Sequence, residues 1–139
     1  MRAVLDPNVL IAALLSPTGA PAQIVARWLA GEFDLVVSES LLAELERALA
    51  HRKPRALISA VDAAAFVALL ANTAVLAPDP AEPEPRSPDP GDDYLIALAE
   101  SEHAILVSGD GHVLGLADRF PIRRPRTFLE LVEADNLET

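Results

Sequence analysis

The sequence lacks cysteine and has no long apolar run. Without thiols the chain has neither a disulfide framework nor a thiolate metal site, which is typical of a reducing compartment. The longest strictly apolar run covers residues 63–71, far short of the roughly 20 residues that a membrane helix needs. Near the N-terminus, Asp6 interrupts the apolar residues and only Arg2 precedes them, unlike a signal peptide. We therefore expect a cytoplasmic protein with no membrane partner.

Several catalytic motifs are also absent. The chain has no GxSxG sequence, and "SPTGAP" at residues 16–21 lacks the lysine and spacing of a phosphate-binding loop. The three histidines are not spaced as zinc ligands. These absences argue against a serine hydrolase, a P-loop nucleotide-binding protein and a zinc enzyme.

Positive charge is scarce. The formal net charge is −10, so the average surface repels a nucleic-acid backbone. Two segments nevertheless concentrate basic residues: Arg47, Arg52, Lys53 and Arg55 in the first, and Arg119, Arg123, Arg124 and Arg126 in the second. Each cluster is either a set of solvated helix ends or a local phosphate-binding patch, and the sequence leaves both interpretations open.

The order of apolar segments predicts an α/β fold. With 51% hydrophobic residues in 139, the chain is long enough for one buried core, and we expect a single domain over residues 1–139. Short β-type runs alternate with segments of helical periodicity, as in a parallel sheet covered by helices on both faces. The expected strands are 2–6, 33–38, 72–77 and 104–108, and the expected helices are 20–31, 38–52, 59–71, 92–103 and 126–135. A proline-rich segment, 78–90, reads as a stiff surface loop.

Four acidic residues are expected at one edge of this sheet. Asp6 closes the first strand, Asp110 follows the fourth, and Asp92 and Asp93 begin a helix. Taken singly, each acid is explained by a helix cap or a turn. Neither structure requires all of them at the same edge, where ligands of parallel sheets bind. Converging carboxylates repel unless a cation or proton lies between them, which indicates an oxygen-ligand site for Mg²⁺ or Mn²⁺.

The helix after the second strand offers another acid. At about 100° per residue, Glu44 and Glu46 border opposite sides of its leucine face. Spacing alone does not choose between them.

Four segments together resemble a known family. "VLDPNVLIAALLS", "VVSESLLAELERAL", "DPGDDYLIALAE" and "ILVSGDGHVLGL", in this order, are similar to the motifs of PIN-domain nucleases, in particular the VapC-type toxins of prokaryotic toxin–antitoxin pairs. The resemblance implies a three-layer, Rossmann-like α/β/α fold with a central parallel sheet. It also implies a metal-dependent endoribonuclease that hydrolyses RNA phosphodiester bonds, and an antitoxin protein as a partner.

The resemblance also assigns residues. It implies catalytic and metal-binding acids at Asp6, Glu44, Asp92 and Asp110, with Mg²⁺ or Mn²⁺ as the cofactor. Asp93 becomes a supporting neighbour of Asp92, and either of the two is a candidate to take a proton from the attacking water. Asn8 and Ser108 match small polar positions beside the acids. Pro7 departs from the pattern, because these proteins usually carry a hydroxyl residue there. The proline removes one backbone donor and one side-chain hydrogen bond, and we expect this loss to alter the metal affinity.

Three alternatives remain. An aspartate-based phosphatase wants a second aspartate where Asn8 stands, and a phospho-receiver domain wants a lysine after a late strand, whereas the only lysine is Lys53. A PIN-like domain without activity would serve as a binding module. The apolar residues of 41–49 and 63–70 also suggest a homodimer or an antitoxin-binding groove, or simply helices that pack on each other.

Overall fold

A parallel sheet of five strands forms the centre of the molecule, with the strand order β3-β2-β1-β4-β5. We analysed a computed structural model that describes residues 1–81 and 93–138. Every neighbouring pair of strands is parallel. The strands are β1 (Arg2–Leu5), β2 (Asp34–Val37), β3 (Val75–Leu76), β4 (Ile105–Val107) and β5 (Ile122–Arg123).

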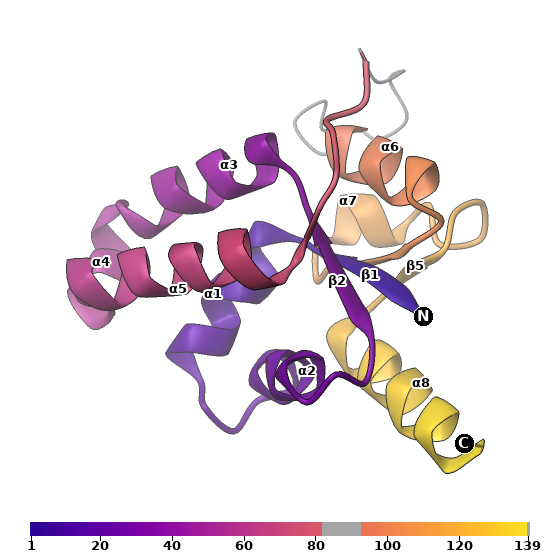
Figure 1. The fold of residues 1–139 in the computed structure, drawn as a ribbon. Helices are drawn as coiled ribbons and strands as arrows, with labels where there is room; N and C mark the ends of the chain where they lie inside the picture. The colour runs from indigo at the N-terminus through magenta and orange to yellow at the C-terminus, as the bar shows by residue number, and fades with distance from the viewer. Residues whose placement is uncertain (82–92, 139) are drawn as a thin grey trace.

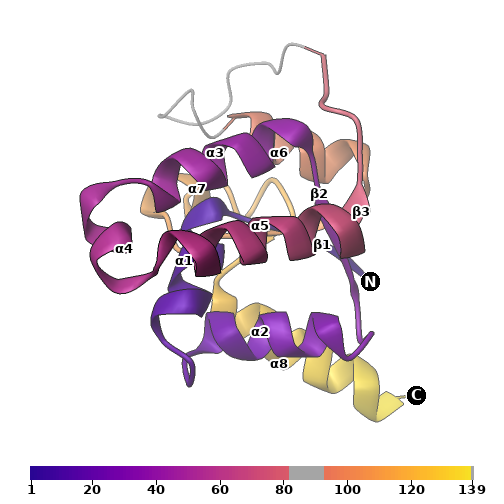
Figure 2. The ribbon, with the colours of Figure 1, turned by 60° about the vertical axis from the view of Figure 1, so that its left-hand side comes forward.

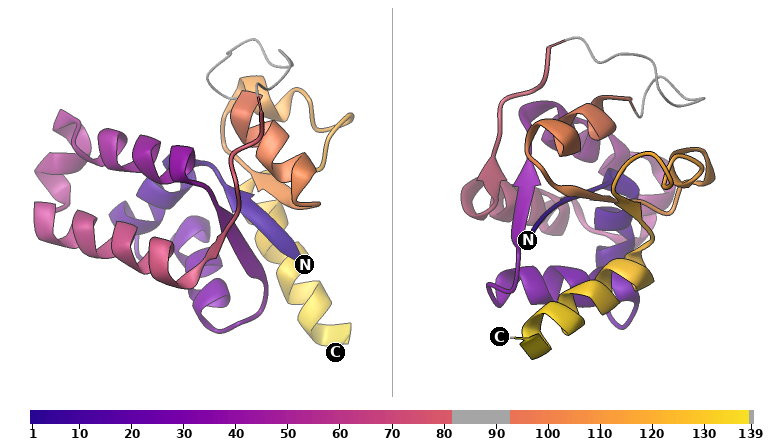
Figure 3. Two further views of the ribbon diagram at one scale, coloured as in Figure 1. Left: turned by 45° about the horizontal axis from the view of Figure 1, so that its top comes forward. Right: turned by 90° about the vertical axis from the view of Figure 1, so that its right-hand side faces the viewer.

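Helices cover both faces of the sheet, which confirms the three-layer α/β/α prediction. In Figure 1 and in the left view of Figure 3, α3 to α5 lie on one side of the strands and α6 and α7 on the other. Figure 2 shows α2 running alongside α8, and the two helices pack together. The helices are α1 (Pro7–Leu15), α2 (Ala20–Leu29), α3 (Glu39–Leu49), α4 (Arg52–Leu57), α5 (Ala60–Thr73), α6 (Asp93–Ser101), α7 (Gly111–Leu114) and α8 (Pro125–Glu138).

The central strands are buried because helices cover them from both sides. Val4 in β1, Val36 in β2 and Val107 in β4 are each 0% exposed. Such continuous burial explains why these strands read as apolar runs rather than as alternating patterns. Phe33 and Phe128 meet edge to face, with ring centroids 5.1 Å apart, and join the start of β2 to α8. The core therefore fixes the strand ends from which the acidic residues project.

The structure corrects several boundaries. The expected helix 38–52 ends at Leu49 as α3, and α1, α4, α7 and β5 are elements that the sequence does not predict. β3 is shorter than expected because α5 continues to Thr73. Most of the proline-rich segment 78–90 lies outside the described residues.

No single helix in the described part of the chain is long and apolar enough to cross a membrane. The pair α1 and α2 passes that test only when joined across a 98° bend.

Candidate active site

Asp6 lies directly after the carboxyl end of β1 and is buried. Its side chain is 4% exposed. The backbone N–H of Asn8 donates to Asp6 Oδ1 (2.9 Å), and the Ser108 hydroxyl donates to Asp6 Oδ2 (2.9 Å). The first contact makes Asp6 the N-cap of α1, so the carboxylate satisfies a free helix amide. Both carboxylate oxygens are thereby oriented.

Pro7 fits this arrangement. It occupies the first turn of α1, where the missing N–H would have had no helical partner and the fixed φ favours helix initiation. The loss of a donor at this position is thus offset by Asn8 and Ser108, which both donate to Asp6.

The surroundings raise the pKa of Asp6. Burial is the largest cause, and the hydrogen bonds from Asn8 and Ser108 oppose it. The negative charges of Glu44 and Asp110 raise the pKa further. Like charges therefore converge on this buried carboxylate, and a cation beside them would relieve both the repulsion and the desolvation.

Ser108 connects Asp6 to Asp110. While its hydroxyl donates to Asp6, its Oγ accepts a hydrogen bond from the backbone N–H of Asp110 (3.0 Å). Ser108 is 0% exposed, and β4 lies beside β1 in the sheet. One hydroxyl therefore fixes the geometry between the ends of the two central strands.

Glu44 faces the same edge from α3. The hydroxyl of Tyr94, in the first turn of α6, donates a hydrogen bond to Glu44 Oε2. Burial first, and then the Glu44 carboxylate, raise the pKa of Tyr94, so the phenol remains a protonated donor. Glu46, by contrast, is exposed and lines a different hollow together with Arg55. The structure thus separates the two glutamates that spacing left open.

The remaining predicted acids are described in part. Asp93 is the first residue of α6 and is 3% exposed. Asp92 lies outside the described residues, so its place in the site stays a prediction. Among the described residues, no group of three or more histidine or acidic side chains is close enough to hold a metal ion. The donor chemistry nevertheless fits Mg²⁺ or Mn²⁺, because Asp6, Glu44 and Asp110 offer only hard oxygen atoms, and the charges of Glu44 and Asp110 both act on Asp6.

Sequence reasoning missed two residues at this edge, Tyr94 and Asp79. Asp79 Oδ2 accepts hydrogen bonds from the backbone N–H and the hydroxyl of Ser40 (3.1 and 2.9 Å). Its charge also reaches Tyr94, whose pKa it raises. Tyr94 is the only tyrosine in the chain and follows two adjacent aspartates, a signal that would have identified it. Asp79 lies in the proline-rich segment 78–90, and no sequence pattern distinguishes it from the other residues there.

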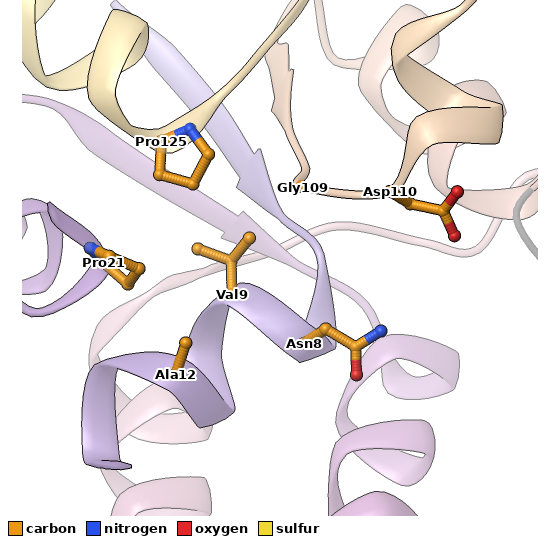
Figure 4. A pocket seen from close by; sticks show the side chains of 7 residues that line it. All are labelled: Asn8, Val9, Ala12, Pro21, Gly109, Asp110 and Pro125. Atoms are coloured by element: carbon orange, nitrogen blue, oxygen red, sulfur yellow. The ribbon is translucent and has the colours of Figure 1, made fainter. Parts of the chain in front are cut away.

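A hollow of about 360 Å³ opens beside Asp110. Figure 4 shows Asn8 and Asp110 at one end of it, Val9 in the middle, and Ala12 and Pro21 at the other end. This volume lies within the range of small-ligand sites. The acidic centre thus borders a space with a polar end and an apolar end.

An α/β/α layer structure with acidic residues at the carboxyl edge of a parallel sheet defines a class of sites that bind cations or phosphates. A profile of the family described as PIN domain matches residues 2–112, and the chain belongs to this family. No curated protein matches the sequence closely. Membership of the PIN-domain family generally implies nuclease activity supported by divalent metal ions.

Proposed function

We propose that the protein is an endoribonuclease dependent on Mg²⁺ or Mn²⁺, and the toxin of a toxin–antitoxin pair. The observation that carries this proposal is the buried Asp6 carboxylate, whose pKa is raised by burial and by the charges of Glu44 and Asp110. A protein pays the cost of such a group only when something compensates it. A cation and the phosphate that it binds are the ligands that suit the family and this oxygen donor set.

Each residue has a separate task in this proposal. Asp6, Glu44 and Asp110, together with Asp92, hold the cation, while Asn8 and Ser108 orient Asp6. A divalent ion supplies charge stabilisation for phosphodiester hydrolysis and makes water nucleophilic near neutral pH.

Tyr94 and Asp93 act beside these ligands. Tyr94 holds one oxygen of Glu44 and so fixes the direction of the other. Asp93, at the start of the same helix, takes a proton from the attacking water in this proposal. No covalent nucleophile is required.

The proposed antitoxin binds elsewhere on the protein. Leu57, the last residue of α4, and Val61, in the first turn of α5, are each 77% exposed. Exposed apolar side chains at the junction of two helices support a protein–protein contact. A second copy of this chain is the alternative occupant of that surface.

The decisive experiment measures RNA cleavage. Purified protein is incubated with a mixed RNA pool, with and without Mn²⁺, beside the Asp92→Asn and Asp110→Asn variants. We expect cleavage only with the metal and a loss of at least a hundredfold in both variants, the size typical for removal of one catalytic group. Cleavage that survives both substitutions contradicts the assignment of the acids.

The second candidate function is a binding module without activity. Wild-type protein that binds RNA or a protein partner yet cleaves no RNA under any metal condition would establish it.

A further inference from the structure

Two hollows adjoin along α3 and the start of α4. The first, of about 410 Å³, is lined by Glu44, Arg47, Ala48, His51 and Tyr94. The second, of about 530 Å³, is lined by Asn8, Ile11, Ala48, His51, Arg52, Lys53 and Pro54. They share Ala48 and His51 and are therefore contiguous along these two residues, and we name the two together the α1–α4 groove. It leads from the acids to the connection between α3 and α4.

The geometry of α3 explains this continuity. Glu44, Arg47 and Ala48 are three and four residues apart, so they lie on one face of the helix. His51, the N-cap of α4, continues that face beyond the end of α3. Asn8 and Ile11 of α1 form the opposite wall, and α1 packs against both α3 and α4. Figure 2 shows α1 beside α4 at the same end of the molecule.

The groove has a charge gradient. At one end it holds the carboxylate of Glu44, and along its length it presents Arg47, Arg52 and Lys53. All three cations are exposed and form no ion pair with any carboxylate in the described part of the chain. In a chain of net charge −10, uncompensated positive charge gathered in one depression favours a polyanionic ligand.

Arg55 does not belong to this gradient, although it lies in the same basic segment. It lines a separate hollow of about 180 Å³ with Glu46 and residues of α5. The fold thus divides the cluster that the sequence presents, placing Arg47, Arg52 and Lys53 in the groove and Arg55 outside it.

We propose that the α1–α4 groove binds the backbone of single-stranded RNA and leads it to the acidic centre. This inference rests on the proposed ribonuclease function and names the substrate path of that site. Arg47, Arg52 and Lys53 bind successive phosphates, and His51 donates a hydrogen bond to one of them. The apolar side chain of Ile11 lines the groove beneath the RNA.

The gradient also gives the path a direction. Phosphates are held by the cations at the α4 end, whereas Glu44 repels them at the other end unless a metal ion neutralises the acids. An RNA strand therefore engages the α4 end without metal and reaches the acids only when metal is bound.

The test compares cations inside and outside the groove. Binding of a short fluorescent single-stranded RNA is followed by anisotropy across a series of NaCl concentrations, in EDTA so that no cleavage occurs. The variants are Arg47→Ala in α3 and the double variant Arg52→Ala/Lys53→Ala in α4. Arg55→Ala, also in α4, is the matched control. Every substituted side chain is exposed, and circular dichroism with thermal melting checks that each variant folds.

The salt dependence gives the expected result. Each phosphate contact to a single strand contributes about 0.7 to the slope of log K against log salt. We expect the slope to fall by about 0.7 in Arg47→Ala and by about twice that in the double variant, with weaker binding in both. Arg55→Ala should keep the wild-type affinity and slope.

The outcomes separate this proposal from the nuclease proposal. If Arg55→Ala weakens binding as much as the groove variants, or if the wild type does not bind RNA, the groove assignment is wrong. If the wild type cleaves RNA with Mn²⁺ and the groove variants bind and cleave like it, the groove is wrong while the nuclease stands. Groove-dependent binding without cleavage in Mn²⁺ retains the groove and removes the nuclease.

Discussion

Asp6 combines a structural and a chemical role in one carboxylate. It caps α1 by accepting a hydrogen bond from the Asn8 amide, and it accepts a second, buried hydrogen bond from the Ser108 hydroxyl. The first role stabilises the fold, whereas the charge itself is unfavourable because burial and two nearby acids raise its pKa. A neutral isostere separates the two roles, since asparagine retains an oxygen that accepts the cap hydrogen bond.

We predict that Asp6→Asn raises the melting temperature of the metal-free protein at neutral pH. The pKa of Asp6 lies above its ordinary value of 3.8, so the native state loses stability as the pH rises through the interval between the two values. The penalty is absent below pH 3.8 and reaches its full size once the pH has risen above the native pKa of Asp6. Thermal melts in EDTA at several pH values measure it.

The matched control is Ser108→Ala, which leaves the charge and removes one hydrogen bond, and which should lower the melting temperature. An Asp6→Asn variant that melts below the wild type at pH 7 would show that the charge itself is stabilising.

Some residues of the site could be predicted from the sequence, and others could not. Asp6 was predictable because the end of its strand is visible in the apolar pattern, whereas Ser108, which donates a hydrogen bond to it, was predicted from the family resemblance. The choice of Glu44 over Glu46 needed the family resemblance, because both glutamates border the same leucine face. The contact between Tyr94 and Glu44 joins residues 50 positions apart, and no local pattern encodes such a pairing.

Among the elements, α3 begins with two capping devices. Ser38 is its N-cap and accepts a hydrogen bond from the Leu41 amide (3.2 Å). Asp79, which follows β3, accepts two more from Ser40 in the first turn. Partial desolvation raises the pKa of Asp79, but the hydrogen bonds from Ser38 and Ser40 outweigh it and lower the pKa overall. A carboxylate at this position also complements the helix dipole.

We predict that Asp79→Asn lowers the melting temperature at neutral pH and has little effect at strongly acidic pH. Because the native pKa is lowered, the ionised group stabilises the fold above its ordinary value of 3.8, and this contribution disappears as the pH falls through the native value. Thermal melts at pH 7 and near pH 2 check the result. Asp118→Asn, an exposed acid in the described loop before β5, is the control, and an equal loss in both variants would exclude a specific cap.

The elements that were missed share a physical cause. β5 comprises only Ile122 and Arg123, and such a short strand exists because β4 offers it an edge. α1 begins at Pro7 and is apolar at nearly every position, with Val9, Leu10 and Ile11 in the core, so it shows no polar face from which a helical period could be recognised. The packing of an apolar helix and the pairing of a short strand with its neighbour are tertiary effects.

At the scale of the whole molecule, the chain order and the sheet order together assemble the site. The three acids whose charges converge follow β1, β2 and β4, and these strands are adjacent in the sheet. Parallel strands end at a common edge, so residues far apart in sequence meet there. The same arrangement concentrates negative charge at one place, which a cation would offset.

We predict that millimolar Mn²⁺ raises the melting temperature of the wild type by several degrees. A ligand bound only by the native state stabilises it by mass action, about 2.7 kcal/mol when its concentration is 100 times Kd. The Asp6→Asn and Asp110→Asn variants should lose this response, while Asp118→Asn keeps it. A shift of equal size in all four proteins would place the metal elsewhere.

The hydrogen bond between Tyr94 and Glu44 joins α6 to α3, helices on opposite sides of the strands (Figure 3). Glu44 therefore keeps its partner only while the first turn of α6 stays closed on the sheet. Local opening of that turn would release Glu44 and displace the buried Asp93 in one event. Amide hydrogen exchange in the first turn of α6 consequently reports how often the assembled acidic centre comes apart, without any substrate being present.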